Sequence, residues 1–160
     1  MTFLEKVKCW FNIGGIDLMF QLDHNIPKQS GEVKGKIVVT SKGERQLKKI
    51  HLRLDQRHDY EESGAKRIKM INIGEMDVPV DYTFKAGETK NIEFTLPFDA
   101  QKTLTDKVAD KLMDQGGLLS VVGSIGSFVS NAQVRYFLNA KAEVEGTLLS
   151  PDTATQMKLL

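Results

Sequence analysis

An alternation of apolar and polar residues over eleven positions, from Val134 to Val144, is the feature that most constrains how this 160-residue chain can fold. Side chains two residues apart lie on the same face of an extended backbone, so this period predicts a strand with one buried face and one solvated face. Shorter stretches with the same period occur within residues 16–99 and again at the end of the chain. We therefore expect about eight strands in an antiparallel sandwich.

Glycine followed by glutamate marks four of the expected strand boundaries, beginning at residues 31, 43, 74 and 87. Glycine adopts the backbone conformations of turns more readily than other residues do. We therefore expect a strand over residues 66–73 that ends at Gly74, and a separate strand around Val80 to Phe84.

The stretch from Gly31 to Leu54 contains two strand patterns separated by a short polar turn at residues 41–44. This arrangement predicts that the two strands are antiparallel neighbours. Across the whole chain, the side chains expected inside the sandwich are Phe20, Ile37, Val39, Ile50, Leu52, Leu54, Phe94, Tyr136 and Leu138.

The composition fits one domain spanning residues 1–160, because 41% hydrophobic residues are enough for a continuous core. The 22 basic and 21 acidic residues leave a net charge of +1, so nothing global favours nucleic acid as a partner. Cys9 is the single cysteine, cannot form an internal disulfide and is expected to be a packed thiol. Residues 1–15 lack the apolar run of a signal peptide, so we expect a cytoplasmic protein.

Residues 2–11 carry apolar side chains at spacings of three and four, which is typical of a short amphipathic helix. The stripe consists of Phe3, Leu4, Val7, Trp10 and Phe11. One interpretation is that it covers one end of the sandwich. The other is an interfacial anchor, since aromatic residues beside lysine are attracted to a membrane surface.

Residues 100–131 replace the strand period with helical spacing and are expected to form a helical, apolar insertion in the sandwich. Leu104, Val108 and Leu112 define the stripe of its first helix. Residues 118–129 contain no charged side chain and form either a second helix or a flexible arm. We expect this arm to pack across the sandwich, to pair with a second copy in a homodimer, or to contact a membrane. Its candidate contact residues are Leu118, Leu119, Val122, Ile125, Phe128 and Val129.

Three segments are similar to parts of a known fold: the Gly-Glu opening of the β-branched strand at 31–40, the Leu-Pro step within 94–98, and the strand at 134–140 with its aromatic and small residues. Together they resemble the arrestin-like superfamily, and within it the bacterial sporulation-control protein family. The amphipathic N-terminus leading to Gly15 and Ile16 also resembles that family. The resemblance implies an all-β fold: a two-layer antiparallel, immunoglobulin-like (arrestin-like) β-sandwich with a helical insertion and a short N-terminal amphipathic helix.

The same resemblance implies a non-enzymatic, cytoplasmic regulatory or scaffold module that binds protein partners through sheet edges and loops. Two departures limit what it implies. The superfamily usually carries two sandwiches in tandem, whereas this sequence holds one, so functions of a second domain are not carried over. In addition, residues 100–131 stand where a shorter connection is expected.

The sequence contains no recognisable constellation of catalytic or metal-binding residues. His51 and His58 are the two closest histidines and are seven residues apart, so on a strand they would face opposite sides. We expect solvated histidines, no metal and no cofactor. Nothing selects the pair of carboxylates that a sugar-processing hydrolase would need, so we do not expect an enzyme.

A local excess of basic residues between Gly31 and Lys69, eleven against six acidic ones, is the most informative polar feature. The candidate interaction face consists of Lys34, Lys36, Lys49, His51 and Arg53. One interpretation is recognition of an acidic or phosphorylated protein segment or of anionic lipid. The other is a solvated face whose lysines discourage edge pairing. Two functions thus remain open: a protein-binding regulator, or a peripheral membrane module that uses the N-terminal helix and the 118–129 arm.

Overall fold

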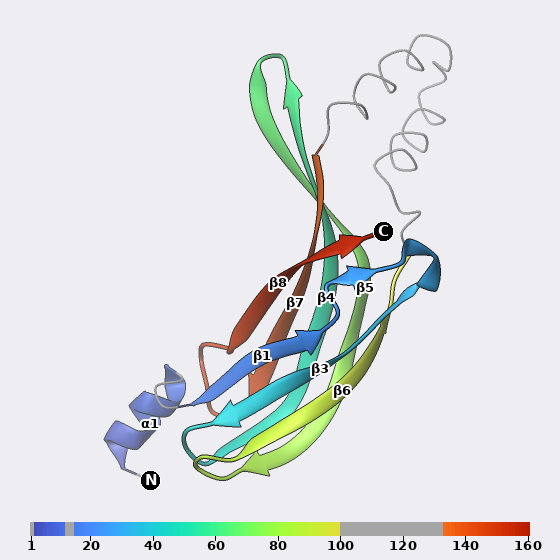
Figure 1. Ribbon diagram of the computed structural model, residues 1–160. Coiled ribbons are helices and arrows are strands. Elements are labelled where there is room, and N and C mark those ends of the chain that lie inside the picture. The colour runs from blue at the N-terminus through green and yellow to red at the C-terminus, as the bar shows by residue number, and fades with distance from the viewer. Residues whose placement is uncertain (1, 12–14, 100–132) are drawn as a thin grey trace, which may run out of the picture.

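The computed structural model describes residues 2–11, 15–99 and 133–160. Its strands form a three-stranded sheet of order β1-β3-β6 and a five-stranded sheet of order β2-β8-β7-β4-β5 (Figure 1). The predicted all-β sandwich is confirmed. The elements are α1 (Phe3–Trp10), β1 (Ile16–Leu22), β2 (Asn25–Ile26), η1 (Lys28–Ser30), β3 (Glu32–Ser41), β4 (Arg45–Glu62), β5 (Ala65–Phe84), β6 (Thr89–Pro97), β7 (Gln133–Val144) and β8 (Asp152–Leu159).

The two strands of residues 31–54 belong to different sheets, so the prediction that they are antiparallel neighbours is wrong. β3 pairs with β1 and β6, whereas β4 pairs with β5 and β7. The short turn between them therefore crosses from one layer to the other. Alternation fixes which side of a strand is buried, and each of these strands can satisfy its apolar side by facing the opposite sheet across the core.

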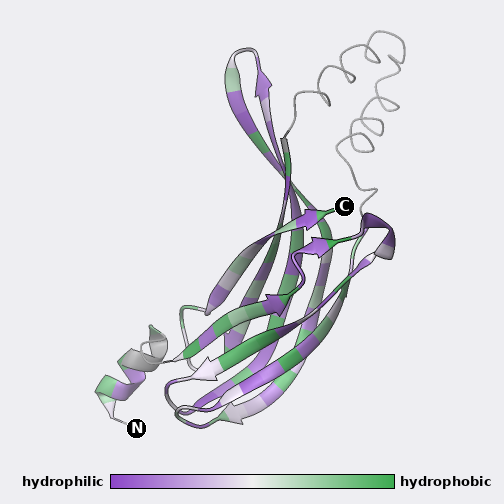
Figure 2. Cartoon of the chain, viewed as in Figure 1, coloured by the Kyte–Doolittle hydropathy of each residue, from purple (hydrophilic) through white to green (hydrophobic). Residues whose placement is uncertain are grey.

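The core lies between the two sheets and is built from the inward positions of both. Hydrophobic and hydrophilic residues alternate along the strands (Figure 2). Eight of the nine side chains expected inside are buried, and Phe20 packs against them while partly exposed. The ring of Phe94 lies over Gly35, where an added Cβ atom would come within 3.2 Å of Phe94 Cζ and 2.7 Å of Leu22 Cβ.

β5 is one strand of 20 residues, so the prediction that a strand ends at Gly74 is wrong. Its pairing with β4 shifts between Leu54 and Asp55, which leaves Ile73 as an extra residue in a β-bulge. The bulge brings β5 close to the end of β6: a Cβ atom on Gly74 would lie 2.5 Å from the carbonyl oxygen of Pro97. Glycine is needed here for close approach between backbones and not for a turn.

β4 and β5 continue together beyond the sandwich as a two-stranded hairpin, seen at the top of Figure 1. The last residue of β4 that pairs with β7 is Asp59, whereas pairing with β5 continues to Glu62 opposite Ala65. Ser63 and Gly64 close the hairpin with φ angles of 53° and 79°. Positive φ at both central residues suits a tight hairpin turn.

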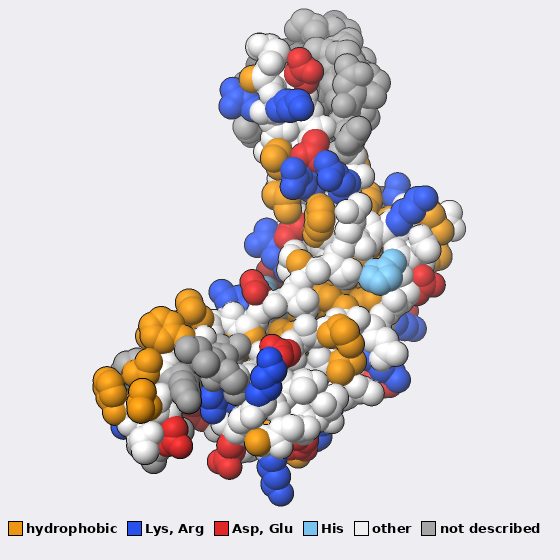
Figure 3. Space-filling view, turned by 60° about the vertical axis from the view of Figure 1, so that its left-hand side comes forward, with side chains coloured by type: hydrophobic (Ala, Val, Ile, Leu, Met, Phe, Trp, Pro, Cys, Tyr) orange, Lys and Arg blue, Asp and Glu red, His pale blue; other side chains and the backbone are white. Residues whose placement is uncertain are grey.

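α1 confirms the predicted N-terminal helix, which begins with a capping box. The Thr2 amide donates to Glu5 Oε2 over 2.6 Å, and the Glu5 amide donates to Thr2 Oγ1 over 3.3 Å. Three side chains of its apolar stripe, Phe3, Leu4 and Phe11, are 75%, 69% and 53% exposed, so the interpretation that the stripe covers one end of the sandwich fails for these three. Hydrophobic side chains gather at this end of the molecule (Figure 3, lower left).

The predicted insertion at 100–131 lies outside the described residues, and so do its arm residues Leu118, Leu119, Val122, Ile125, Phe128 and Val129. The strands on either side of it, β6 and β7, belong to the two sheets of the same sandwich. Within the described ranges, no helix has the length and apolar character needed to span a bilayer.

Candidate functional site: the outer face of the five-stranded sheet

The five residues of the predicted basic face are divided between the two layers. Lys34 and Lys36 are on β3 of the three-stranded sheet, whereas Lys49, His51 and Arg53 are on β4 of the five-stranded sheet. Both groups alternate with buried residues and therefore point outward, in opposite directions. The expectation of one continuous basic face is wrong, because the strands that carry it are not neighbours.

The two lysines of β3 are each paired with a carboxylate. Lys34 Nζ lies 2.8 Å from Glu32 Oε1, and Lys36 Nζ lies 3.5 Å from Glu93 Oε1. The hydrogen bond that Lys34 donates to Glu32 raises the pKa of Lys34. The outer face of the three-stranded sheet is therefore locally neutral around these residues.

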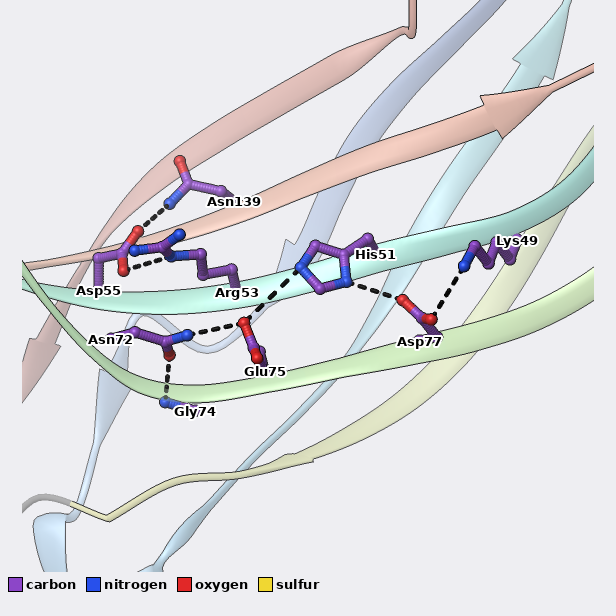
Figure 4. A network of polar contacts seen from close by, with 9 residues as sticks. All are labelled: Lys49, His51, Arg53, Asp55, Asn72, Gly74, Glu75, Asp77 and Asn139. Atoms are coloured by element: carbon purple, nitrogen blue, oxygen red, sulfur yellow. Dashed lines mark hydrogen bonds and ion pairs between the residues drawn. The ribbon is translucent and has the colours of Figure 1, made fainter.

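The outer face of β4 carries a longer network, which is drawn in Figure 4. Asp77 of β5 lies at its centre: Oδ1 is 2.7 Å from His51 Nδ1, and Oδ2 is 3.0 Å from Lys49 Nζ. The hydrogen bonds that His51 and Lys49 donate to Asp77 lower the pKa of Asp77. The bond between Lys49 and Asp77 also raises the pKa of Lys49. Two weaker ion pairs extend the network, from Lys49 to Glu143 at 3.7 Å and from His51 to Glu75 at 3.9 Å.

A second cluster follows along the same face, around Asp55. Arg53 Nε lies 2.7 Å from Asp55 Oδ1, and Asn139 Nδ2 donates to Asp55 Oδ2 over 3.2 Å. Asp55 is only 6% exposed, so the charge of its carboxylate is balanced by the guanidinium beside it. Glu75 of the first network accepts a hydrogen bond of 2.7 Å from Asn72, which connects that network to the bulge of β5 (Figure 4).

A shallow depression of about 420 Å³ opens beside these clusters, over β4, β7 and β8. It is lined by His51, Arg53, Asn139, Ala140, Lys141, Asp152, Thr153 and Ala154. Cationic, anionic and amide side chains thus surround the small side chain of Ala154. We call the residues of the network and this depression the outer-face site.

Comparisons with known proteins agree with the fold. Residues 4–117 match the family described as SpoOM protein (Spo0M). The chain belongs to the Spo0M family. The resemblance to sporulation-control proteins is thereby confirmed, as is the arrestin-like, β-rich fold that it implies.

A solved structure is similar to this Spo0M-family chain over most of its length: Spo0M, a sporulation control protein from Bacillus subtilis, with a TM-score of 0.58 and 16% sequence identity. The match covers 91% of this chain and 48% of the other, so the chain spans about half the length of that protein. At this identity the likeness establishes a shared fold. The comparison with curated proteins gives no match.

Acidic residues of the outer-face site were not singled out from the sequence of this Spo0M-family member. Glu75 and Asp77 are more than 20 positions from their partners on β4, and they reach them because Asp77 is opposite His51 and Glu75 is opposite Arg53 in the ladder. The only available signal is alternation, which places both acids on one side of a strand. Which strand lies next to it depends on the tertiary fold.

The three histidines occupy different environments, and the expectation that all are solvated is wrong for His58, which is 5% exposed. It faces inward at the base of the hairpin, where burial lowers its pKa and the nearby charge of Lys69 lowers it further. Its Nε2 has no hydrogen-bond partner among the described residues. Nearby, Gln56 donates to the Tyr136 hydroxyl over 3.1 Å. Within the described part of the chain, no three His, Cys, Asp or Glu side chains are grouped to hold a metal ion.

Proposed function

We propose that this Spo0M-family chain is a non-enzymatic regulatory module that acts in sporulation control by binding a protein partner in the cytoplasm. Two findings support the role: membership of the family, and the shared fold with a protein that carries the name sporulation control protein. The observation that supports this surface as the binding site is the outer-face network, in which Asp77 forms hydrogen bonds with both Lys49 and His51.

The network is better suited to recognition than to stability. Lys49, His51 and Asp77 keep between 43% and 48% of their side-chain surface exposed, and ion pairs at such positions contribute little to the free energy of folding. They do hold long side chains in fixed positions. An ordered pattern of opposite charges around a shallow depression gives a partner both orientation and specificity.

Charge reversal on the two outer faces tests this proposal. The double variant Lys49→Glu with Arg53→Glu places carboxylates beside Asp77 and Asp55, whereas the matched double variant Lys34→Glu with Lys36→Glu makes the same charge change on the opposite sheet. Each is expressed in the native host in place of the parent, cross-linked and captured, and the bound proteins are quantified by mass spectrometry. We expect a specific partner to be lost with the first variant and kept with the second. Equal capture by both variants and the parent would refute the proposed site.

A second candidate function is favoured by α1. Its exposed Phe3, Leu4 and Phe11 are accompanied by Lys6, a combination that binds at the interface of an anionic membrane. This candidate makes the chain a peripheral membrane module. Co-sedimentation with anionic and neutral liposomes, compared with a Phe3→Ser and Leu4→Ser variant, tests it directly. Failure of the parent chain to sediment with either type would refute it.

A further inference from the structure

We infer that the edge of β5 at residues 65–71, which runs along the projecting hairpin to its base, binds an extended protein segment in which apolar and acidic residues alternate. This inference rests on the proposed function only in that the occupant is a protein. It assigns a surface separate from the outer-face site, and it names the chemistry of the segment that would fit there.

Among the described strands, none pairs with this edge of β5. β5 is the last strand of its sheet and is hydrogen-bonded to β4 alone among the described strands. Along residues 65–72 its register runs without a shift, so the backbone is regular. A regular strand with one unpaired side is a template on which another extended segment can form a ladder.

The rest of the β5 edge is occupied or blunted. The Asp99 amide donates to the Ile73 carbonyl over 2.8 Å, and Gly74 lies against Pro97. Further along, Pro79 lacks an amide hydrogen, and Asp81 has a φ of 44° next to a second register shift. Prolines and bulges protect sheet edges from pairing. Among the described residues, protection by prolines, bulges and covering segments begins at Ile73 and does not extend to residues 65–72.

Between residues 67 and 70 the side chains of this edge separate by chemistry between the two faces. On the outer face, Ile68 is opposite Asp59 and Met70 is opposite Arg57, and they are 58% and 46% exposed. On the inner face, Arg67 and Lys69 alternate with them. Basic and hydrophobic side chains are visible together on and below the hairpin in Figure 3.

The charged residues of this edge are all cationic. Between residues 65 and 74, β5 carries Lys66, Arg67 and Lys69 and no acidic residue. Arg67 reaches only the exposed Glu62, at 4.0 Å, and Lys69 has no ion pair within the described ranges. An added strand alongside residues 67–70 would therefore meet apolar side chains on the outer face and the weakly paired cations Arg67 and Lys69 on the inner face, with Lys66 on the outer face next to Ile68.

A segment with alternating apolar and acidic residues matches both faces at once. Its apolar side chains would pack against Ile68 and Met70, and its carboxylates would lie opposite Arg67 and Lys69, as cross-strand pairs do in a ladder. A second copy of the chain fits less well. Two β5 edges paired about a two-fold axis at Ile68 would set Arg67 against Lys69, and like charges directly opposite are destabilising.

The test uses the full chain and three labelled peptides with capped ends: one that alternates valine and glutamate, one that alternates valine and lysine, and one with the same valines and glutamates in two blocks. Binding is measured by fluorescence anisotropy and located by amide hydrogen exchange. We expect the alternating valine–glutamate peptide to bind at least about tenfold more tightly than the others, and the amides of residues 65–71 to gain protection. Equal binding of the three peptides would overturn the inference.

Charge reversal provides the matched variants. Arg67→Glu with Lys69→Glu is expected to weaken binding of the valine–glutamate peptide by about tenfold and to create binding of the valine–lysine peptide. Lys28→Glu with Lys158→Glu makes the same charge change at two exposed positions near β2 and should keep the parent's preference. A thermal midpoint confirms that each variant is folded. A preference that does not invert in the first variant would overturn the inference.

Two further outcomes would assign the edge to another occupant and overturn the inference. One is a parent dimer that becomes a monomer on Ile68→Lys, which indicates a second copy. The other is peptide binding that occurs only after residues 101–131 are replaced by a glycine–serine bridge, which indicates the chain's own segment. Partner capture through the outer-face site is independent of all these results, so failure here is distinguishable from failure of the proposed function.

Discussion

Replacing Leu52 with alanine is the sharpest perturbation of the sandwich, because this side chain is fully buried on β4, a strand that is paired on both sides. In the ladder it is opposite Met76 of β5 and Ala140 of β7. Ala140 is too small to fill the space that the leucine leaves, so much of the cavity persists. Deleting a buried leucine side chain in this way costs about 2 to 5 kcal/mol of unfolding free energy. For a chain of this size, that loss lowers the thermal midpoint by roughly 4 to 20 °C.

Urea unfolding followed by circular dichroism measures this loss, with the thermal midpoint as a second readout. Met19→Ala is the matched control, because Met19 is on a strand but 61% exposed, and we expect it to change the free energy by less than about 0.5 kcal/mol. A loss below about 1 kcal/mol for Leu52→Ala would contradict the assignment of this face of β4 to the core.

Two other predictions concern the bulge and the buried histidine. Gly74→Ala should destabilise the chain by about 1 to 3 kcal/mol in urea unfolding, because its Cβ atom would lie 2.5 Å from a backbone oxygen; no loss would mean that β6 does not approach β5 there. Burial lowers the pKa of His58 from 6.5, so the folded state favours the neutral ring. We expect its contribution to the free energy of unfolding to be fully present above pH 6.5 and to be lost as the pH falls below 6.5 through the folded pKa. His58→Asn should remove that loss and the exposed-site control His24→Asn should keep it, whereas a loss that persists in His58→Asn would refute its origin in this ring.

The sequence predicted the strands and their buried sides well, because alternation is a local property of the backbone. It placed Leu52 and Tyr136 inside correctly. It did not predict which strands pair, since β3 and β4 could satisfy their apolar sides equally well as neighbours or across the core. Gly74 was misread for a related reason: a glycine needed for close approach and a glycine needed for a turn have the same sequence signal.

The candidate site was predicted less completely than the fold. The outward direction of Lys49, His51 and Arg53 followed from alternation, but their partners Asp77 and Asp55 did not. A count of charges along the sequence suggests that nearby basic residues form a patch. In the sheet, Lys49 instead pairs with an acid from the neighbouring strand, and Arg53 pairs with an acid from its own strand. The exposed stripe of α1 also differs from the expectation, because amphipathic spacing indicates a helix and not what covers it.

The affinity of the purified chain for the captured partner, measured at two ionic strengths, tests the outer-face site most directly. We expect Lys49→Glu with Arg53→Glu to weaken binding at low salt far more than Lys34→Glu with Lys36→Glu does. Raising the salt from about 0.05 to 0.5 M should reduce this difference, because screening weakens exposed charge interactions. A dissociation constant that is the same for the parent and both variants, and insensitive to salt, would contradict the proposed site.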